Sequence, residues 1–267
     1  SSSRLGERVS VDPVISCGHC YPCRIGKPNV CTSLVVLGVH RDGGFCEYAV
    51  VPACNAWKIP DAINDEHAVM VEPFTIAANA TGQLNPREDD IALIYGAGPM
   101  GLTTVQALKG VYKVGQVIVA DRIDERLEMA KRSGADIVLN NTDLSLKEIL
   151  AERGIKPTLI VDAACHPTIL QEAIGLASPA ARIVIMGFSS KPSEIIQQGI
   201  TGKEISIFST RLNANKFPVV IDWLSKGLID PDKLVTHKFD YQHVADAIEL
   251  FEKDQKQCCK VLLKFHE

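Results

Sequence analysis

From Ile91 onward, apolar runs of strand length alternate with segments whose apolar residues recur at helical spacing. The apolar runs are IALIY, VIVAD, IVLNN, TLIVDAA, RIVIMGF and EISIFST. Strands that are apolar throughout and separated by amphipathic helices are typical of a parallel sheet covered on both faces. The pattern therefore predicts an α/β fold with a doubly wound parallel sheet.

The chain before this region has a different pattern. It is rich in Cys, Gly and Pro, it contains short strand-like stretches such as GERVSV and FCEYAVV, and no long helical pattern begins before about Asp65. It predicts a separate, mostly β region. After Thr210 we expect helix, strand, helix and strand in FPVVIDWLSKGL, LVTHKF, VADAIELFEKD and CCKVLLKF.

Composition narrows the classes of partner. The chain has 267 residues, of which 46% are hydrophobic, and its net charge is −4. This charge provides no field that attracts phosphate backbones or anionic lipid, so nucleic acids and membrane surfaces are poor partners. No apolar run approaches the ~20 residues that span a bilayer, and SSSRLGERVSVDP lacks the apolar stretch of a secretory signal. We expect a cytoplasmic protein.

The stretch CGHCYPCRIGKPNVC places four cysteines close together: Cys17, Cys20, Cys23 and Cys31. Disulfides are disfavoured in a reducing compartment, whereas four thiolates can surround one tetrahedral Zn²⁺ and leave no position for water or substrate. This spacing predicts a structural zinc. The alternatives are unconnected thiols, a disulfide, or a zinc ribbon that binds nucleic acid, and a single Arg and Lys between the cysteines argue against the last.

The other five cysteines have no metal-ligand spacing, and we expect them to be buried small hydrophobic residues. They are Cys46, Cys54, Cys165, Cys258 and Cys259.

The stretch GAGPMG follows a buried strand and opens a helix, which is the context of a dinucleotide-binding loop. The predicted cofactor-binding loop consists of Gly96, Ala97, Gly98, Pro99, Met100 and Gly101. Asp121 ends the next strand, where a carboxylate accepts hydrogen bonds from a ribose and repels a 2′-phosphate, so NAD is favoured. Arg122 complicates this choice because an Arg there can accept a 2′-phosphate. Alternatively, Asp121 only caps the next helix.

Two further polar residues are candidates for chemistry. Glu72, in HAVMVEPF, lies among apolar residues, where a carboxylate is costly unless it is paired or bound to a metal. The alternative is a Glu at a domain junction with a solvent or Arg partner. His40, in LGVHRDGGFCEY, is either a hydrogen-bonded structural residue or a catalytic group.

Together, CGHCYPCRIGKPNVC, DGGFCEY, VEPF and GAGPMG…VIVAD resemble the zinc-dependent medium-chain dehydrogenase/reductase family, in its polyol and threonine dehydrogenase branch. The resemblance implies a Rossmann domain and a GroES-like β domain with a structural-zinc lobe. The expected division is residues 1–72 for the GroES-like part, 73–211 for the Rossmann domain and 212–267 for the return to the first domain. Family members are usually dimers or tetramers, so a homo-oligomer is expected.

The resemblance also implies a function: a zinc- and NAD-dependent oxidoreductase that passes a hydride from a secondary hydroxyl of a polyol, sugar acid or similar small molecule to NAD. It makes Glu72 a ligand of a catalytic zinc that lowers the pKa of the alcohol. It places Arg211 and Asn213, in STRLNANKFP, near substrate and cofactor, and His40 is a further catalytic candidate.

The start of the chain bears on this function. Family members carry a Cys and a His-Glu pair upstream that hold the catalytic zinc, whereas this sequence begins on Ser1 and reaches the strand-like GERVSV at once. We expect that an upstream segment is missing and that the GroES-like domain is incomplete. The alternative is a protein that binds NAD without catalysis, as a sensor or a truncated inactive relative.

Overall fold

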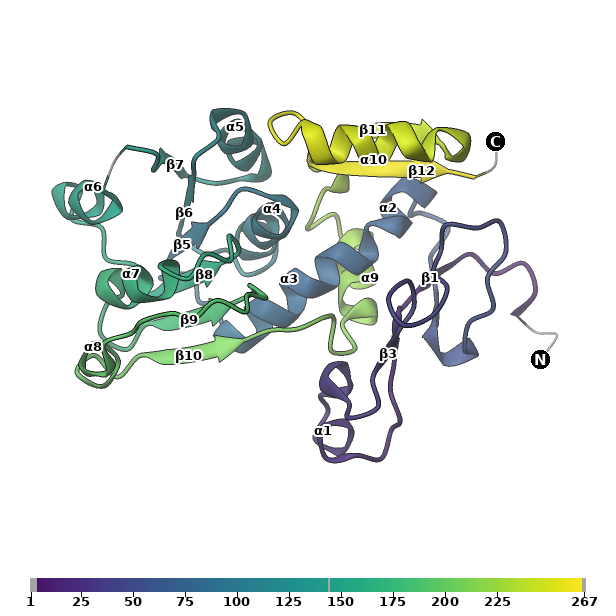
Figure 1. Ribbon diagram of the computed structural model, residues 1–267, viewed down its shortest axis with the longest axis horizontal. Helices are drawn as coiled ribbons and strands as arrows, with labels where there is room; N and C mark the ends of the chain where they lie inside the picture. Colours follow the sequence, from purple (N-terminus) through teal and green to yellow (C-terminus); the bar gives the residue numbers. More distant parts are fainter. Residues whose placement is uncertain (1–3, 144, 266–267) are drawn as a thin grey trace.

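The computed structural model describes residues 4–143 and 145–265. Its largest sheet has six strands in the order β10-β9-β8-β5-β6-β7, and every pairing in it is parallel (Figure 1). These strands are β5 (Ile91–Tyr95), β6 (Gln116–Asp121), β7 (Ile137–Asn140), β8 (Leu159–Asp162), β9 (Arg182–Ile185) and β10 (Ser206–Ser209). The chain order reverses between β5 and β8, so the predicted doubly wound sheet is confirmed.

Side chains of the central strands alternate between two apolar clusters. In β5, Ala92 and Ile94 belong to one cluster, while Leu93 and Tyr95 belong to the other. The first cluster includes side chains of α3 (Val71–Leu84), α4 (Pro99–Gln106), α5 (Asp124–Ser133) and α9 (Phe217–Ser225). The second includes those of α6 (Leu146–Glu152) and α7 (Ile169–Leu176). Burying one large apolar side chain contributes roughly 1.5–3 kcal/mol, which explains why strands apolar throughout need helices on both faces.

Helix α3 connects the sheet to the rest of the molecule (Figure 1). It follows the short helix α2 (Asp65–Val69) and ends at Asn85, whose φ of 47° is left-handed. Near its end, Gln83 Nε2 donates to the carbonyl of Ser209, the last residue of β10, at 2.7 Å. The expected boundary after residue 72 falls within this continuous helix, and the division into three parts stays a proposal.

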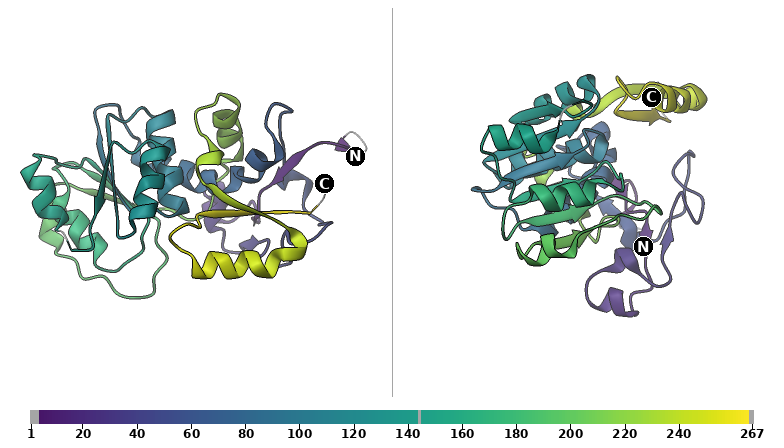
Figure 2. Two further views of the ribbon diagram at one scale, coloured as in Figure 1. Left: turned by 90° about the horizontal axis from the view of Figure 1, so that it is seen from above. Right: turned by 60° about the vertical axis from the view of Figure 1, so that its left-hand side comes forward.

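The remaining strands occur in pairs. Near the N-terminus, β1 pairs with β4 and β2 with β3, both antiparallel, and near the C-terminus β11 and β12 pair in parallel beside α10 (Figure 2). The strands and helices concerned are β1 (Val9–Val11), β2 (Val14–Ile15), β3 (Val35–Val36), β4 (Ala56–Lys58), α10 (Val244–Lys253), β11 (Val235–Asp240) and β12 (Lys260–Lys264). The four expected elements after Thr210 are thus all present.

The predicted zinc lobe, residues 17–31, is called the cysteine lobe below. It contains the short helix α1 (Tyr21–Arg24) and the 3-10 turn η2 (Pro28–Val30), and it projects from the rest of the molecule in Figure 1.

The stretch FCEYAVV does not form the strand that its pattern predicts. Residues 45–51 are irregular, and the side chains of Phe45, Tyr48 and Val50 are 75%, 88% and 100% exposed. A strand needs a neighbour to bond its main-chain groups, and no segment of the described residues pairs with this one.

Three of the five other cysteines contradict the expectation of burial. Cys46, Cys54 and Cys165 are exposed, whereas Cys258 and Cys259 are buried. Cys165 lies at a left-handed φ of 62° in the turn after β8, and Cys46 lies in the irregular stretch 45–51. Both positions lie outside regular elements, so residue type alone misled the prediction.

Candidate functional site

The cysteine lobe brings its four cysteine sulfurs together. All of them lie within 4.8 Å of one another, and Cys20 Sγ is 3.4 Å from Cys23 Sγ and 3.7 Å from Cys31 Sγ. Sulfurs bonded at ~2.3 Å to one tetrahedral Zn²⁺ stand about 3.8 Å apart. The four side chains therefore fit a zinc ion, and a site closed by four thiolates has a structural role.

Main-chain amides stabilise negative charge on these sulfurs. Cys20 N–H donates to Cys17 Sγ at 3.4 Å, and Cys17 N–H donates to Cys31 Sγ at 3.3 Å. Hydrogen bonds from main-chain N–H groups, that of Thr32 above all, lower the pKa of Cys20 to about 5. Desolvation and the adjacent Cys20 sulfur raise the pKa of Cys23 to about 11. These main-chain hydrogen bonds favour the thiolate form of cysteine, which is the form that binds zinc.

The loop between β5 and α4 brings the glycines of GAGPMG into close contact. Gly96 has a left-handed φ of 96°, and a Cβ on Gly101 would lie 1.9 Å from the Gly96 carbonyl oxygen. A Cβ on Gly98 would meet no described atom within 4 Å, so the surface over this residue is open. Gly98 is the N-cap of α4 and Pro99 follows it. This geometry fits a pyrophosphate at the N-terminus of α4.

Asp121 joins this loop to the end of β6. Its Oδ2 accepts a hydrogen bond from Ala97 N–H at 2.7 Å, and its Oδ1 accepts one from Ile123 N–H at 2.9 Å. Ile123 is the N-cap residue of α5, so Asp121 binds both the glycine loop and the turn that begins the next helix. Each carboxylate oxygen retains a second lone pair that can accept a ribose hydroxyl. The neighbouring Arg122 is exposed.

Glu72 lies half-buried in the first turn of α3. Burial raises the pKa of its carboxyl; the Lys260 ammonium opposes this rise and the Asp12 carboxylate adds to it. The expected burial of Glu72 is therefore present. The opposing charge is that of Lys260, not the Arg of the alternative, and the role of Glu72 stays a prediction.

The structure gathers no metal site around Glu72. Two groups of three or more possible ligands occur within residues 4–143 and 145–265, and Glu72 belongs to neither. One is the set of four cysteines, and the other consists of His67, Asp230 and Asp232. In the second, His67 Nε2 lies 3.1 Å from Asp232 Oδ1 and links α2 to the 3-10 turn η5 (Pro231–Lys233). One carboxylate does not make a catalytic zinc site, so no reaction step is derived through such a metal.

A cavity of about 260 Å³ is lined by residues of the cysteine lobe and by Arg211. It is lined by Val30, Cys31, Thr32, Leu34, His40 and Arg211. The Arg211 guanidinium lies 5.2 Å from the centre of the exposed Phe188 ring, close enough for a cation–π contact. His40 Nδ1 accepts a hydrogen bond from Val36 N–H at 2.9 Å, which leaves its Nε2 as the nitrogen that carries hydrogen. The structure thus brings His40 and Arg211 to one cavity.

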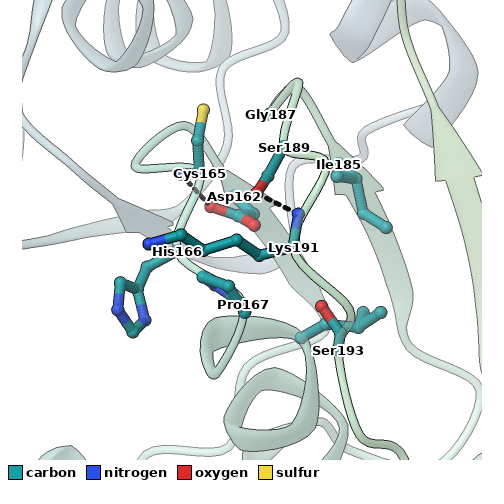
Figure 3. A pocket seen from close by; sticks show the side chains of 10 residues that line it. Asp162, Cys165, His166, Pro167, Ile185, Gly187, Ser189, Lys191 and Ser193 are labelled. Carbon is teal, nitrogen blue, oxygen red and sulfur yellow. Dashed lines mark hydrogen bonds between the residues drawn. The ribbon is translucent and has the colours of Figure 1, made fainter.

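A smaller cavity, of about 100 Å³, opens where β8 and β9 end (Figure 3). Asp162, the last residue of β8, accepts hydrogen bonds at Oδ1 from the N–H groups of Ala164 and Cys165, and burial raises its pKa. Lys191 reaches the same cavity from the loop after β9. Ligands of doubly wound sheets bind at the carboxyl ends of strands. Sequence analysis missed these residues, although their place after two predicted strands was a usable signal.

Four buried polar residues lie near Arg211: Asp12, Asn29, Asn79 and Asn213. The first three received no role in the sequence analysis. Asn213 was expected near substrate, but it is only 1% exposed and donates to Asp12 Oδ1 at 2.7 Å. Isolated Asn and Asp residues carry no motif, so no pattern in the sequence indicates these contacts.

Comparison with known proteins gives matches over most of the chain. The model of the alcohol dehydrogenase GroES-like domain matches residues 1–61, and that of the zinc-binding dehydrogenase matches residues 99–226. Among the described helices, none is both long and apolar enough to cross a membrane.

Individual relatives agree with these models. The starvation-sensing protein RspB of Escherichia coli K12 is 76% identical over 100% of this chain and 78% of its own length. Sorbitol dehydrogenase of Bacillus subtilis is 30% identical over 97% of this chain and 74% of its own. A crystal structure of the rspB alcohol dehydrogenase from E. coli CFT073, complexed with the cofactor NADH, superposes with a TM-score of 0.98 at 76% identity, over 99% of this chain and 79% of that one.

Proposed function

This chain belongs to the zinc-binding, medium-chain dehydrogenase/reductase family, and from that premise we propose that it oxidises a secondary hydroxyl of a small polyol, sugar acid or similar alcohol with NAD. The observation that carries the proposal is the glycine loop tied to the Asp121 carboxylate by the 2.7 Å hydrogen bond from Ala97. A relative 76% identical in sequence binds NADH, which supports the same cofactor here.

The described residues have distinct roles in this proposal. Main-chain N–H groups of Gly98, Met100 and Gly101 at the start of α4 face the pyrophosphate, and Asp121 accepts the ribose hydroxyls. Arg211, across the 260 Å³ cavity, provides a positive charge for the cofactor or for a hydroxylated substrate. His40 lies on the same cavity and is proposed as a polar contact of the substrate.

The reaction balances without further reactants. A hydride leaves the carbinol carbon for C4 of the nicotinamide, the hydroxyl releases a proton, and the products are a ketone, NADH and that proton. In enzymes of this chemistry a zinc in an open site makes the alkoxide available. We propose Glu72 as one ligand of such a zinc, and we assign no step to that metal because, among the described residues, Glu72 belongs to no group of three or more possible ligands. The zinc assigned to the cysteine lobe is structural.

The cofactor assignment predicts a preference between two dinucleotides. We expect the purified protein to bind NADH at least tenfold more tightly than NADPH in calorimetric titrations, because Asp121 accepts from the ribose and repels a 2′-phosphate. Hydrogen bonds to a charged group are worth roughly 1.5–3 kcal/mol, so Asp121→Ala weakens NADH binding by about one to two decades. Asp124→Ala, which removes a carboxylate from the first turn of α5, is the matched control and retains the wild-type affinity.

Equal affinity of the unmutated protein for both dinucleotides would show that Asp121 does not bind the ribose. The dehydrogenase activity is tested separately, by following NADH absorbance while the full product of the gene is offered a panel of polyols and sugar acids. We expect turnover of at least one of them. NADH binding without turnover across the panel would favour the non-catalytic, NAD-binding alternative.

The setting of this activity completes the proposal. We propose that the protein acts in the cytoplasm as a homodimer or homotetramer. Light scattering of the purified protein measures the mass in solution, and a monomer at micromolar concentration contradicts the oligomer.

A further inference from the structure

The turn that follows β10 has an unusual backbone. Leu212, Ala214 and Asn215 have left-handed φ angles of 49°, 45° and 63°, and Arg211 immediately precedes them. Residues with a Cβ rarely adopt this conformation, and such strain persists only where neighbouring groups enforce it. The turn at residues 211–215 is therefore held in place by contacts from elsewhere in the molecule.

Side-chain amides from two distant elements provide those contacts. Asn29 Nδ2 donates to the Arg211 carbonyl at 2.6 Å, while Asn79 Nδ2 donates to the Arg211 and Leu212 carbonyls at 3.2 and 3.0 Å. Asn29 lies in η2, within the cysteine lobe, and Asn79 lies in α3. Both are buried, being 6% and 7% exposed. The shortest of these bonds thus comes from the lobe that carries the metal ligands.

A third contact holds the centre of the turn. Asn213 donates through Nδ2 to Asp12 Oδ1 at 2.7 Å, and its own Oδ1 accepts from Asn215 N–H at 2.9 Å. Asp12 Oδ1 also accepts from Val14 N–H, so it is fixed at the start of β2. Buried amide and carboxyl groups that all find partners keep a single conformation, because the loss of any bond leaves an unsatisfied buried group.

The same lobe faces the Arg211 side chain across the 260 Å³ cavity. Val30 and Cys31, the two residues after Asn29, form part of the cavity wall. Asn29 therefore connects the metal ligands on one side to the main chain of Arg211 on the other. Its Nδ2 makes this bond, and its Oδ1 has no partner within the residues that the structure describes.

We propose that Asn29 is a positioning residue that couples the folding of the cysteine lobe to the placement of the Arg211 guanidinium. The inference rests on the proposed function, in which Arg211 provides a positive charge for the cofactor or substrate, and it takes the cofactor as the group that Arg211 contacts. When zinc orders the lobe, Asn29 holds the Arg211 carbonyl and the strained turn directs the guanidinium into the cavity. When the lobe loses its metal, the turn relaxes and cofactor affinity falls, although the metal touches no part of the cofactor.

The coupling makes two measurable claims. A double-mutant cycle on the NADH dissociation constant uses Asn29→Ala, Arg211→Ala and the double variant. We expect Asn29→Ala to raise the constant about 5- to 30-fold, the range for removing one hydrogen bond to a buried acceptor. In the Arg211→Ala background the same change has no further effect, because the guanidinium that it positions is gone.

The second claim concerns the turn itself and needs no cofactor. Hydrogen–deuterium exchange of the peptide covering residues 209–217 is expected to be faster in Asn29→Ala and in zinc-stripped protein than in the wild type. Gln106→Ala is the matched control for both claims: Gln106 is also buried, and its amide donates to a main-chain carbonyl of a distant segment, that of Asp230, at 2.9 Å. It is expected to change neither the NADH affinity nor exchange at residues 209–217.

Zinc content of every variant is measured alongside. If Asn29→Ala loses its zinc, the coupling is tested on the wild-type protein instead. Coupling requires that saturating NADH slows the release of zinc from the wild type to a chelator, and that Arg211→Ala abolishes this protection. Any of three results would overturn the coupling: unchanged NADH affinity in Asn29→Ala, effects of the two substitutions on the NADH dissociation constant that multiply, or unchanged exchange at residues 209–217. Failure of the wild type to bind NADH would instead overturn the proposed function, and the exchange measurement would still decide whether Asn29 holds the turn.

Discussion

The six-stranded sheet and the N-terminal region of residues 4–60 are stabilised in different ways. In the sheet, the side chains of Leu93, Ile118 and Ile160 are 0% exposed, and helices cover both faces. In the N-terminal region, the described strands pair only two by two, and Tyr48 and Val50 are 88% and 100% exposed. Apolar burial thus accounts for the order of the sheet, whereas it leaves the N-terminal region largely unexplained.

The N-terminal region depends on polar and metal-ligand groups instead. Its cysteines converge within 4.8 Å of one another, and Asn55 donates from a buried position to the carbonyls of Asp12 and Val14 at 2.9 and 2.7 Å. Small regions without a sufficient apolar core commonly use a metal to stabilise their fold. The comparison teaches that one chain can contain a part held mainly by hydrophobic burial beside a part whose described contacts are largely polar and whose cysteines converge on one site.

The largest expected effect comes from removing one metal ligand, which is expected to disorder the N-terminal region and leave the sheet intact. Cys20→Ser is expected to abolish zinc binding, because three thiolates and a hydroxyl do not close the site, and apparent zinc binding energies of about 10–16 kcal/mol are folding energies in small zinc domains. Metal analysis and regional hydrogen exchange are the measurements. We expect residues 12–41 to lose protection while β5, β6 and β8 keep theirs.

The exposed Cys46 offers the matched control, since Cys46→Ser changes the same atom outside the metal group. That variant keeps one zinc per chain and wild-type exchange. Full zinc retention in Cys20→Ser would refute the metal assignment. Loss of protection throughout the sheet would break the comparison, because it would make the two regions one cooperative unit.

A smaller effect tests the sheet side of the comparison. In Gly101→Ala the added Cβ would lie 1.9 Å from the Gly96 carbonyl oxygen, so α4 and the glycine loop must separate. Overpacking of this kind costs roughly 1–3 kcal/mol. We expect a lower free energy of unfolding in urea and at least tenfold weaker NADH binding, with the zinc content unchanged.

Gly98→Ala sharpens this test, because its Cβ would meet no described atom within 4 Å. It is expected to keep the wild-type free energy of unfolding and to weaken NADH binding, since the methyl group occupies the space proposed for the pyrophosphate. If Gly101→Ala and Gly98→Ala have the same free energy of unfolding, the close approach of Gly101 to the Gly96 carbonyl is not what holds the loop.

The smallest effect concerns a buried acid of the N-terminal region. Burial raises the pKa of Asp12, while the Val14 N–H and the Asn213 amide act against this rise. An acid whose pKa is higher in the folded state than in the unfolded chain stabilises the fold below its unfolded pKa of about 3.9. It loses that contribution as the pH rises through the folded pKa. We expect Asp12→Asn, which keeps an Oδ1 acceptor, to flatten this part of the decline in unfolding free energy as the pH rises from about 4.

Urea titrations at a series of pH values measure this slope, and the exposed Asp61→Asn is the control that keeps the wild-type profile. A steeper decline in Asp12→Asn than in the wild type would show that the carboxylate is better stabilised in the folded protein than its burial implies.

Local sequence patterns sufficed for the sheet and for the convergence of the four cysteines. The run from IALIY through GAGPMG to VIVAD predicted β5, α4 and β6 because strand, loop and helix signals follow one another directly. The four cysteines were predicted together because they lie within fifteen positions of the chain, Cys17 to Cys31. The family resemblance of these motifs was confirmed by the matches to residues 1–61 and 99–226.

The rest depends on contacts between distant parts of the chain. Asn29 and Arg211 are 182 positions apart, and a lone Asn looks the same whether it faces solvent or a buried carbonyl. Strand propensity failed in FCEYAVV for a related reason: alternating residues form a strand only where a partner strand and a face to bury exist. The roles of Glu72, His40 and Arg211 likewise stay predictions that the experiments above address.

The hydrogen bond between Gln83 and Ser209 has a consequence for protein engineering. It places the end of α3, where the chain enters the sheet, next to the end of β10, where the chain leaves it. A unit whose entry and exit lie side by side can be exchanged through two neighbouring junctions. Residues 85–208 are in this sense a cassette, and a sheet with a different dinucleotide preference can be grafted at Gln83 and Ser209 without rebuilding the cysteine lobe.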